Sequence, residues 1–131
     1  MIGLDTNVLV RYLTQDHPEQ SPRANELIES RCTREDPGWI PLIVVCELVW
    51  VLRGAYGYQK SVVIQVLEQI LASRDLEVGD AQIAASALSA YKNGPADFAD
   101  YAIVLSSRAA GCELTYSFDQ KLARHQSVRM P

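Results

Sequence analysis

The 131-residue chain carries a formal net charge of −4 at pH 7, and 48% of its residues are hydrophobic. These values predict one domain over residues 1–131 with a buried core, and they argue against binding of nucleic acid by bulk positive charge. Three widely spaced cysteines and two histidines argue against a zinc site or a disulfide framework. With no run of 18 apolar residues and no signal peptide, we expect a cytoplasmic protein without a membrane span.

The first half of the chain alternates strand and helix signals. Residues 2–5 predict a buried strand, and Asp5 or Thr6 can cap the helix that follows it. A loop, a helix to about Ser30, a turn and a short strand at Trp39 and Ile40 come next. The long apolar run from residue 42 to about 56 predicts a mostly buried helix.

The second half repeats this alternation. Helical spacing of apolar residues over 61–72 precedes a short strand at 76–78 and a helix that starts after Asp80. A further helix over 96–110 leads to a strand at 113–116. A short helix through Leu122 follows. The alternation predicts an α/β fold with a small, mainly parallel central sheet flanked by helices.

Four carboxylates are placed where this fold would bring them to one edge of the sheet. Asp5 ends the first strand and Asp119 follows the strand at 113–116, and functional groups gather at the carboxyl ends of parallel strands. Glu47 interrupts an apolar run, and Asp100 lies on a later helix. Ionised carboxylates in apolar surroundings are costly to bury unless a cation joins them. We therefore expect bound Mg²⁺ or Mn²⁺ and phosphodiester hydrolysis.

Each acid also has a purely structural explanation. Asp5 and Asp119 could cap the helices that follow them. Glu47 has no capping role in the middle of a helix, but it could form an ion pair with Arg11 or Arg53. The joint occurrence of all four acids favours the metal site over these separate explanations.

Asp97 is a fifth acidic candidate with two explanations. It lies three residues before Asp100, so on a helix the two side chains project to the same face, ~5–6 Å apart at Cβ. Asp97 could be a further metal ligand, or it could be the N-cap residue of the helix that follows Gly94 and Pro95. Both readings stay open at the level of sequence.

Basic and aromatic residues near these acids are candidates for RNA contacts. Four cations could bind phosphates, although each could equally be an ordinary solvated charge: Arg11, Arg53, Lys121 and Arg124. Trp50 could stack on a base, but core packing or an oligomer interface explains it better.

Taken together, four segments resemble a PIN-domain ribonuclease. They are Leu-Asp-Thr-Asn-Val-Leu-Val near the start, the Glu within an apolar helix, Ala-Asp-Phe-Ala-Asp-Tyr-Ala-Ile, and Thr-Tyr-Ser-Phe-Asp-Gln-Lys-Leu near the end. The resemblance covers nearly the whole chain, and the length is similar to that of VapC toxins of toxin–antitoxin pairs. It implies a PIN-like fold, dependence on Mg²⁺ or Mn²⁺, an RNA substrate, a VapB-type antitoxin as inhibitor, and a homodimer.

The same resemblance implies roles for individual residues. Asp5, Glu47 and Asp100 match the core metal ligands, and Asp119 matches a fourth acid. Two further positions match polar residues that orient the acids by hydrogen bonds: Asn7 and Ser117. Hydrolysis by metal-activated water should leave a 5′-phosphate and a 3′-hydroxyl.

The leading hypothesis is therefore a metal-dependent endoribonuclease that acts as the toxin of a type II toxin–antitoxin pair. A PIN nuclease with a housekeeping role in RNA processing is an alternative that the sequence hardly separates from it. A binding module without catalysis would have lost some of the acids, and all four are present. A phosphoacceptor receiver domain needs paired acids after its first strand, where this chain has only Asp5.

Overall fold

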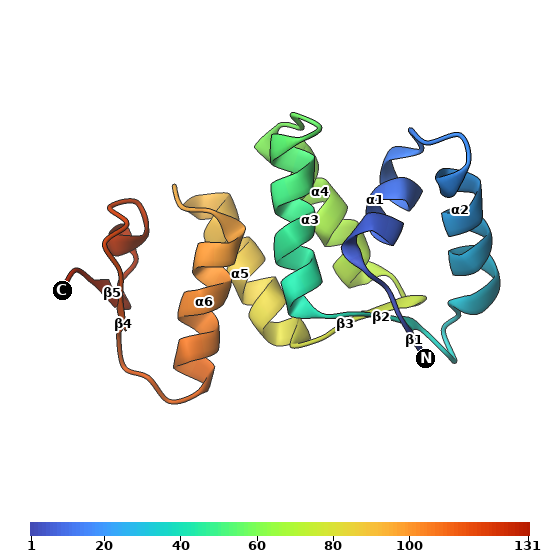
Figure 1. Ribbon diagram of the computed structural model, residues 1–131. Coiled ribbons are helices and arrows are strands. Elements are labelled where there is room, and N and C mark those ends of the chain that lie inside the picture. The colour runs from blue at the N-terminus through green and yellow to red at the C-terminus, as the bar shows by residue number, and fades with distance from the viewer. The chain divides into compact units, whose positions relative to one another are not determined.

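Strands and helices alternate along the computed structural model, which describes residues 1–131, and the predicted α/β class is confirmed (Figure 1). The chain divides into two compact units, residues 1–81 and residues 82–131. The first contains a three-stranded sheet and the second a two-stranded sheet, and both sheets are parallel. The expectation of a single domain over residues 1–131 stays a prediction.

The sheet of the first unit consists of β1 (Ile2–Gly3), β2 (Gly38–Ile40) and β3 (Leu76–Val78), in that order. Beyond β1, the backbone N–H of Leu4 donates to the carbonyl of Trp39 at 2.8 Å and extends the ladder. The central strand, β2, requires a glycine at its first position, Gly38. A Cβ at position 38 would lie 2.7 Å from Cys32 Sγ and 2.8 Å from Leu4 Cδ1.

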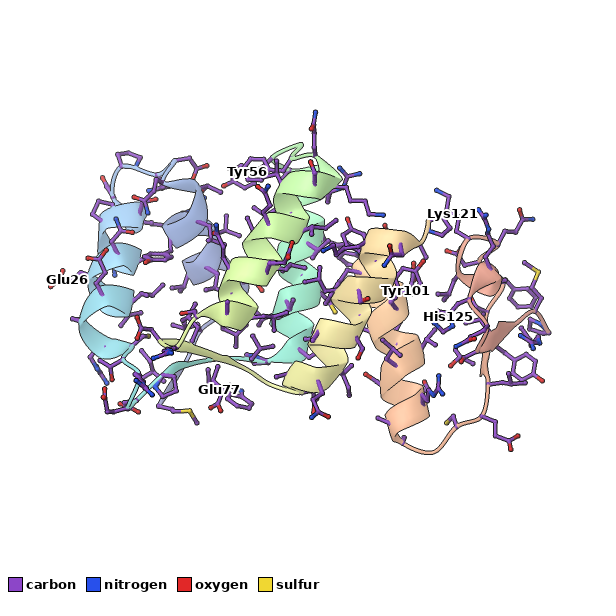
Figure 2. All side chains as sticks on the ribbon, turned by 180° about the vertical axis from the view of Figure 1, so that it is seen from behind. Glu26, Tyr56, Glu77, Tyr101, Lys121 and His125 are labelled. Atoms are coloured by element: carbon purple, nitrogen blue, oxygen red, sulfur yellow. The ribbon has the colours of Figure 1, made fainter.

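Four helices complete this unit: α1 (Thr6–Thr14), α2 (Gln20–Arg31), α3 (Leu42–Gly54) and α4 (Lys60–Ala72). Both views show them standing on the same side of the strands (Figures 1 and 2). Helix α2 starts inside the predicted loop, because Pro22 fits the first turn, where a backbone N–H has no helical partner. The most deeply buried side chains of the unit are Leu9, Ile40, Leu48, Leu52, Val63 and Leu67.

Helix α3 is less buried than its sequence predicts. Val44, Val45, Leu48, Val49 and Leu52 form its buried face. The opposite face carries Ile43, Glu47 and Trp50, and Trp50 is 66% exposed. Of the two structural explanations for Trp50, core packing is therefore wrong, and an oligomer interface stays a prediction. A run of apolar residues conceals the 3.6-residue period that sends every third or fourth side chain outward.

The second unit contains α5 (Ala81–Asn93), α6 (Phe98–Ala109), β4 (Thr115–Tyr116), the 3₁₀ helix η1 (Leu122–Arg124) and β5 (Val128–Arg129). The first residue of α5, Ala81, is the last residue of the first unit. Helices α5 and α6 meet through an edge-to-face pair, Tyr91 and Phe98, with ring centroids 6.2 Å apart. Helix α6 ends where Gly111 takes a φ of +102°, which is accessible to glycine at little cost.

Two features near the C-terminus differ from the sequence prediction. The short helix begins at Leu122, where it was expected to end. Strand β5 was not predicted, because two residues, Val128 and Arg129, are too few to show a period of alternation. The strand nevertheless pairs with β4 and closes the end of the unit.

Candidate active site

In the first unit, Asp5 follows β1 and is the N-cap residue of α1. Its Oδ1 accepts a hydrogen bond of 2.7 Å from the backbone N–H of Thr6. The capping explanation for Asp5 is thus confirmed, but it occupies only one carboxylate oxygen. The side chain is exposed and Oδ2 has no hydrogen-bond partner, so capping leaves that oxygen free for a further ligand.

Glu47 is linked to the same place through Thr6. The Thr6 hydroxyl donates to Glu47 Oε1 at 3.0 Å, so one residue contacts both acids. Neither Arg11 nor Arg53 forms an ion pair with Glu47, and that alternative explanation is wrong. The sequence analysis considered Thr6 only as a helix cap and did not predict its contact with Glu47. The only sign of such a role in the sequence is that Thr6 directly follows Asp5.

Asn7 does not take the role that the resemblance implies for it. It is exposed and makes no hydrogen bond to Asp5 or Glu47. Helical geometry explains the difference, because consecutive residues on α1 point about 100° apart, and of these two residues it is Thr6 that reaches Glu47 on α3. Asn7 lines a groove of about 440 Å³ over α1 and α2 instead.

In the second unit, three acids line one pocket of about 370 Å³ together with Lys121. Asp97 is the N-cap residue of α6, so this reading of Asp97 is confirmed. Asp100 reaches back, and its Oδ2 accepts from the backbone N–H of Asp97 at 3.1 Å. Asp97 still lines the pocket beside Asp100 and Asp119, so capping and ligation remain compatible.

The environment of Asp100 disfavours its charge. Partial burial is the main cause of a raised pKa for this carboxyl. The hydrogen bond from the Asp97 backbone lowers the pKa, while the nearby carboxylates of Asp119 and Asp97 raise it further. A positive charge placed in this pocket would relieve the repulsion.

Asp119 is held by its own loop. Its Oδ1 accepts from the backbone N–H groups of Lys121 at 2.8 Å and Leu122 at 3.0 Å. These two hydrogen bonds stabilise a turn before η1, which therefore begins only at Leu122. The N-cap residue of η1 is Lys121, so the expectation that Asp119 is the cap is wrong. Ser117 contacts Asp119 as expected, but its hydroxyl accepts from the Asp119 backbone N–H at 3.0 Å. Ser117 therefore orients the loop and does not touch the carboxylate.

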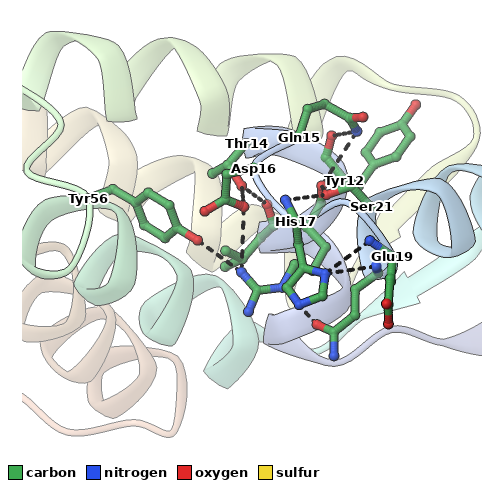
Figure 3. A network of polar contacts seen from close by, with 11 residues as sticks. Tyr12, Thr14, Gln15, Asp16, His17, Glu19, Ser21 and Tyr56 are labelled. Atoms are coloured by element: carbon green, nitrogen blue, oxygen red, sulfur yellow. Dashed lines mark hydrogen bonds and ion pairs between the residues drawn. The ribbon is translucent and has the colours of Figure 1, made fainter.

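Arg11 and Arg53, two of the four candidates for phosphate contacts, already have partners. Arg11 donates to Gln20 and to Tyr56 and lies 3.5 Å from Asp16. Tyr56 and Asp16 are labelled in the polar network of Figure 3. Arg53 donates to a backbone carbonyl at 2.9 Å.

The other two candidates for phosphate contacts, Lys121 and Arg124, differ from this pair. Both are exposed, and no ion pair or side-chain hydrogen bond engages them. Each lines a pocket of the second unit.

Oxygen donors without a counter-charge are common to both units. None of Asp5, Glu47, Asp97, Asp100 and Asp119 forms an ion pair with a lysine or arginine. Hard oxygen ligands of this kind suit Mg²⁺ and Mn²⁺. Neither unit by itself assembles three or more such side chains into a metal-holding group. The donor set therefore fits the chemistry of a divalent cation, with two acids in one unit and three in the other.

Comparison with known protein families matches residues 2–127 to the PIN domain. The chain belongs to the PIN-domain family, and its α/β architecture is the PIN-like fold. PIN domains are in general metal-dependent nucleases that typically use Mg²⁺ or Mn²⁺, and PIN nucleases bind RNA.

No curated protein matches the chain. None of the helices combines the length and the apolar character that crossing a membrane requires.

Proposed function

We propose that this protein is an Mg²⁺- or Mn²⁺-dependent endoribonuclease that acts as the toxin of a type II toxin–antitoxin pair. Its ligands in this proposal are Asp5, Glu47, Asp100 and Asp119, with Asp97 as a further candidate. Membership of the PIN family supports the nuclease activity, while the toxin role, a VapB-type antitoxin and a homodimer rest on the resemblance to VapC toxins.

One observation carries the proposal. Asp97, Asp100 and Asp119 line one pocket without an ion-pair partner, and burial and the neighbouring carboxylates raise the pKa of Asp100. A protein that used these acids only for capping would gain by pairing them, because uncompensated like charges repel. Membership of the PIN family explains why these carboxylates lack a cationic partner, because a bound metal ion would supply the positive charge.

In this proposal, residues of the chain have separate roles in metal binding and in substrate binding. Bound Mg²⁺ or Mn²⁺ supplies positive charge and lowers the pKa of water for attack on phosphorus. Thr6 positions the Glu47 carboxylate through its hydroxyl. The acids hold the cation, and Lys121 in the acid-lined pocket offers a charge to the RNA phosphate. The products should carry a 5′-phosphate and a 3′-hydroxyl.

The first experiment tests cleavage. Purified protein is incubated with total cellular RNA in Mn²⁺, in Mg²⁺ and in EDTA, beside the Asp100→Asn variant. Discrete fragments that require metal and are absent from the variant are expected, and mapping of their ends identifies the target. Equal cleavage by the wild type and Asp100→Asn would refute the site assignment, and no cleavage under any condition would favour a binding-only PIN module.

A second experiment separates a toxin from a housekeeping nuclease. Induced expression in a bacterial host should arrest growth, and the Asp100→Asn variant should not. Coexpression of the protein encoded by an adjacent small gene should restore growth if that gene encodes the antitoxin. Normal growth with active enzyme would support the housekeeping alternative.

The homodimer is tested independently of activity. Light scattering on the purified protein at micromolar concentration should give twice the chain mass of 14.6 kDa. A mass of one chain would reject the dimer without touching the proposed chemistry.

A further inference from the structure

A second pocket of the C-terminal unit is larger than the acid-lined one, at about 610 Å³. Its polar walls come from α5, α6 and the segment from η1 to residue 126: Ser86, Ser89, Asn93, Arg108, Arg124 and His125. No aspartate or glutamate lines it. The volume lies within the range of ~300–1,000 Å³ that is typical of small-ligand sites.

The pocket is rich in uncommitted donors. Arg108 and Arg124 are exposed, and neither forms an ion pair or a side-chain hydrogen bond. His125 packs against Tyr101 with ring centroids 6.1 Å apart, and Figure 2 shows the two residues on facing elements. His125 Nδ1 accepts from the backbone N–H of Ser127 at 3.0 Å, so the proton of the neutral ring is on Nε2.

The charge of the chain is distributed unevenly between the two units. Residues 1–81 contain 12 acidic and 7 basic residues, whereas residues 82–131 contain 4 acidic and 5 basic ones. From residue 114 onward, Asp119 is the only acid, against three basic residues. The net acidity that argued against nucleic-acid binding therefore belongs to the first unit.

The two pockets of the C-terminal unit adjoin each other. Pro95 lines both. Residues 119–121 line the acid pocket, which contains the three aspartates. Residues 124–126, a few residues further along the same segment, line the larger, cationic pocket, which contains Arg108 and Arg124. A polyanion held at the acids through metal ions would thus present its next charges to Arg108 and Arg124.

We propose that the cationic pocket binds a backbone phosphate of the RNA substrate next to the phosphate that is cleaved. This inference rests on the proposed ribonuclease function and extends it by naming where the flanking nucleotide binds. Arginine guanidinium groups match phosphate oxygens through paired N–H donors, and the hydroxyl groups of Ser86 and Ser89 add further donors. An acidic peptide would share the charge, but the adjoining acid pocket favours a phosphodiester chain.

The test measures RNA binding without metal, so that it does not depend on cleavage. Fluorescence anisotropy of a labelled 12-nucleotide oligouridylate is recorded in EDTA at several salt concentrations, with wild type, the double variant Arg108→Gln/Arg124→Gln and the control Arg34→Gln. Arg34 is exposed in the first unit, lines neither pocket and has no ion-pair partner. The melting temperature of each variant shows that it is folded.

The double variant should bind the oligonucleotide about tenfold or more weakly, since two charge-assisted contacts are lost. The slope of log affinity against log salt should fall by about 0.7, the value for one phosphate contact on a single strand. The control should match the wild type. The variant Arg108→Lys/Arg124→Lys keeps both charges and should recover the slope, which loss of packing alone would not predict.

Unchanged affinity and salt slope in the double variant, with a wild type that cleaves RNA, would overturn this inference alone. An acidic protein partner would then be the occupant to test. A wild type that neither binds nor cleaves RNA would overturn the proposed function together with it.

Discussion

The Thr6 hydroxyl donates a hydrogen bond to Glu47 Oε1 at 3.0 Å, across 41 residues of sequence. Thr6 is buried, while Glu47 is exposed on the outward face of α3. The backbone N–H of the same threonine binds Asp5. A single residue at the start of α1 therefore sets the positions of two candidate ligands from different elements.

Thr6→Val should reduce nuclease activity by about 10–100-fold, as expected when the partner that orients a metal ligand is lost. The valine keeps the shape but cannot donate to Glu47, and its backbone N–H still binds Asp5. The lost hydrogen bond should lower the free energy of unfolding by only ~1 kcal/mol. Kinetics against metal concentration separate the effects, because weaker metal binding raises the concentration needed for half-maximal rate.

Thr6→Ser is the matched control. It retains the hydroxyl and should keep most of the activity. If Thr6→Val and the wild type cleave RNA equally at limiting metal, the hydrogen bond to Glu47 is structural only.

Divalent metal should stabilise the folded protein. A metal concentration tenfold above the dissociation constant adds ~1.4 kcal/mol to the free energy of unfolding. The melting temperature should therefore rise in Mg²⁺ or Mn²⁺ and return to its starting value in EDTA. The shift should be smaller in Asp100→Asn and in Glu47→Gln. An identical shift in both variants would contradict their assignment as ligands.

Asp100→Asn should make the metal-free fold more stable at neutral pH. Burial and neighbouring carboxylates raise the pKa of Asp100 in the folded state, while the unfolded value is 3.8. At pH 7 the ionised form is present in both states and is penalised only in the folded one, so replacing it removes a cost.

That gain should disappear as the pH falls below 3.8, where the carboxyl is protonated in both states. Asparagine retains an oxygen that can accept from the Asp97 backbone, so the start of α6 should be preserved. Melting temperatures in EDTA at pH 7 and pH 3 test both statements. A lower melting temperature for Asp100→Asn at pH 7 would refute the repulsion argument.

Asp16 should have the opposite dependence on pH. The hydrogen bond from the Thr14 hydroxyl at 2.7 Å is the main cause of its lowered pKa, with Tyr56 and the charge of Arg11 acting in the same direction. Its contribution to stability is therefore complete above the unfolded value of 3.8 and is lost as the pH falls through the folded pKa.

Asp16→Asn should thus lower the urea midpoint at pH 7 and have little effect at the acid end. Asp75→Asn serves as the comparison, because the Asp75 carboxylate is exposed and accepts no hydrogen bond. Equal midpoints for Asp16→Asn and the wild type at pH 7 would show that the network in Figure 3 adds no net stability.

Gly94→Ala should destabilise the second unit by ~1–3 kcal/mol through overpacking. A Cβ at position 94 would collide with the hydroxyl oxygen of Tyr101, which accepts from the backbone N–H of Ala96. Gly54→Ala is the control, since nothing lies within 4 Å of that position at the end of α3. Denaturation curves should show a loss for the first variant and no loss for the second.

Much of the secondary structure could be predicted from local pattern. The strand at 76–78 matches β3 residue for residue, and the long helix after Pro41 ends within two residues of its predicted limit. Strand β5 escaped prediction because its backbone pairs with β4, thirteen residues away, and its own sequence is too short to show it. The capping of α6 by Asp97 was one of two readings that only the backbone geometry could separate.

The sequence by itself determined the α/β class and the order of the helices and of four of the five strands, because those depend on the spacing of apolar residues along the chain. Its residue types also singled out the candidate acids. Only the tertiary structure decided that Glu47 lies on an exposed helix face, that Thr6 holds it, and that Arg11 is engaged elsewhere. A period in sequence gives the direction of a side chain about its own helix axis, but the partner that it meets depends on which element packs there.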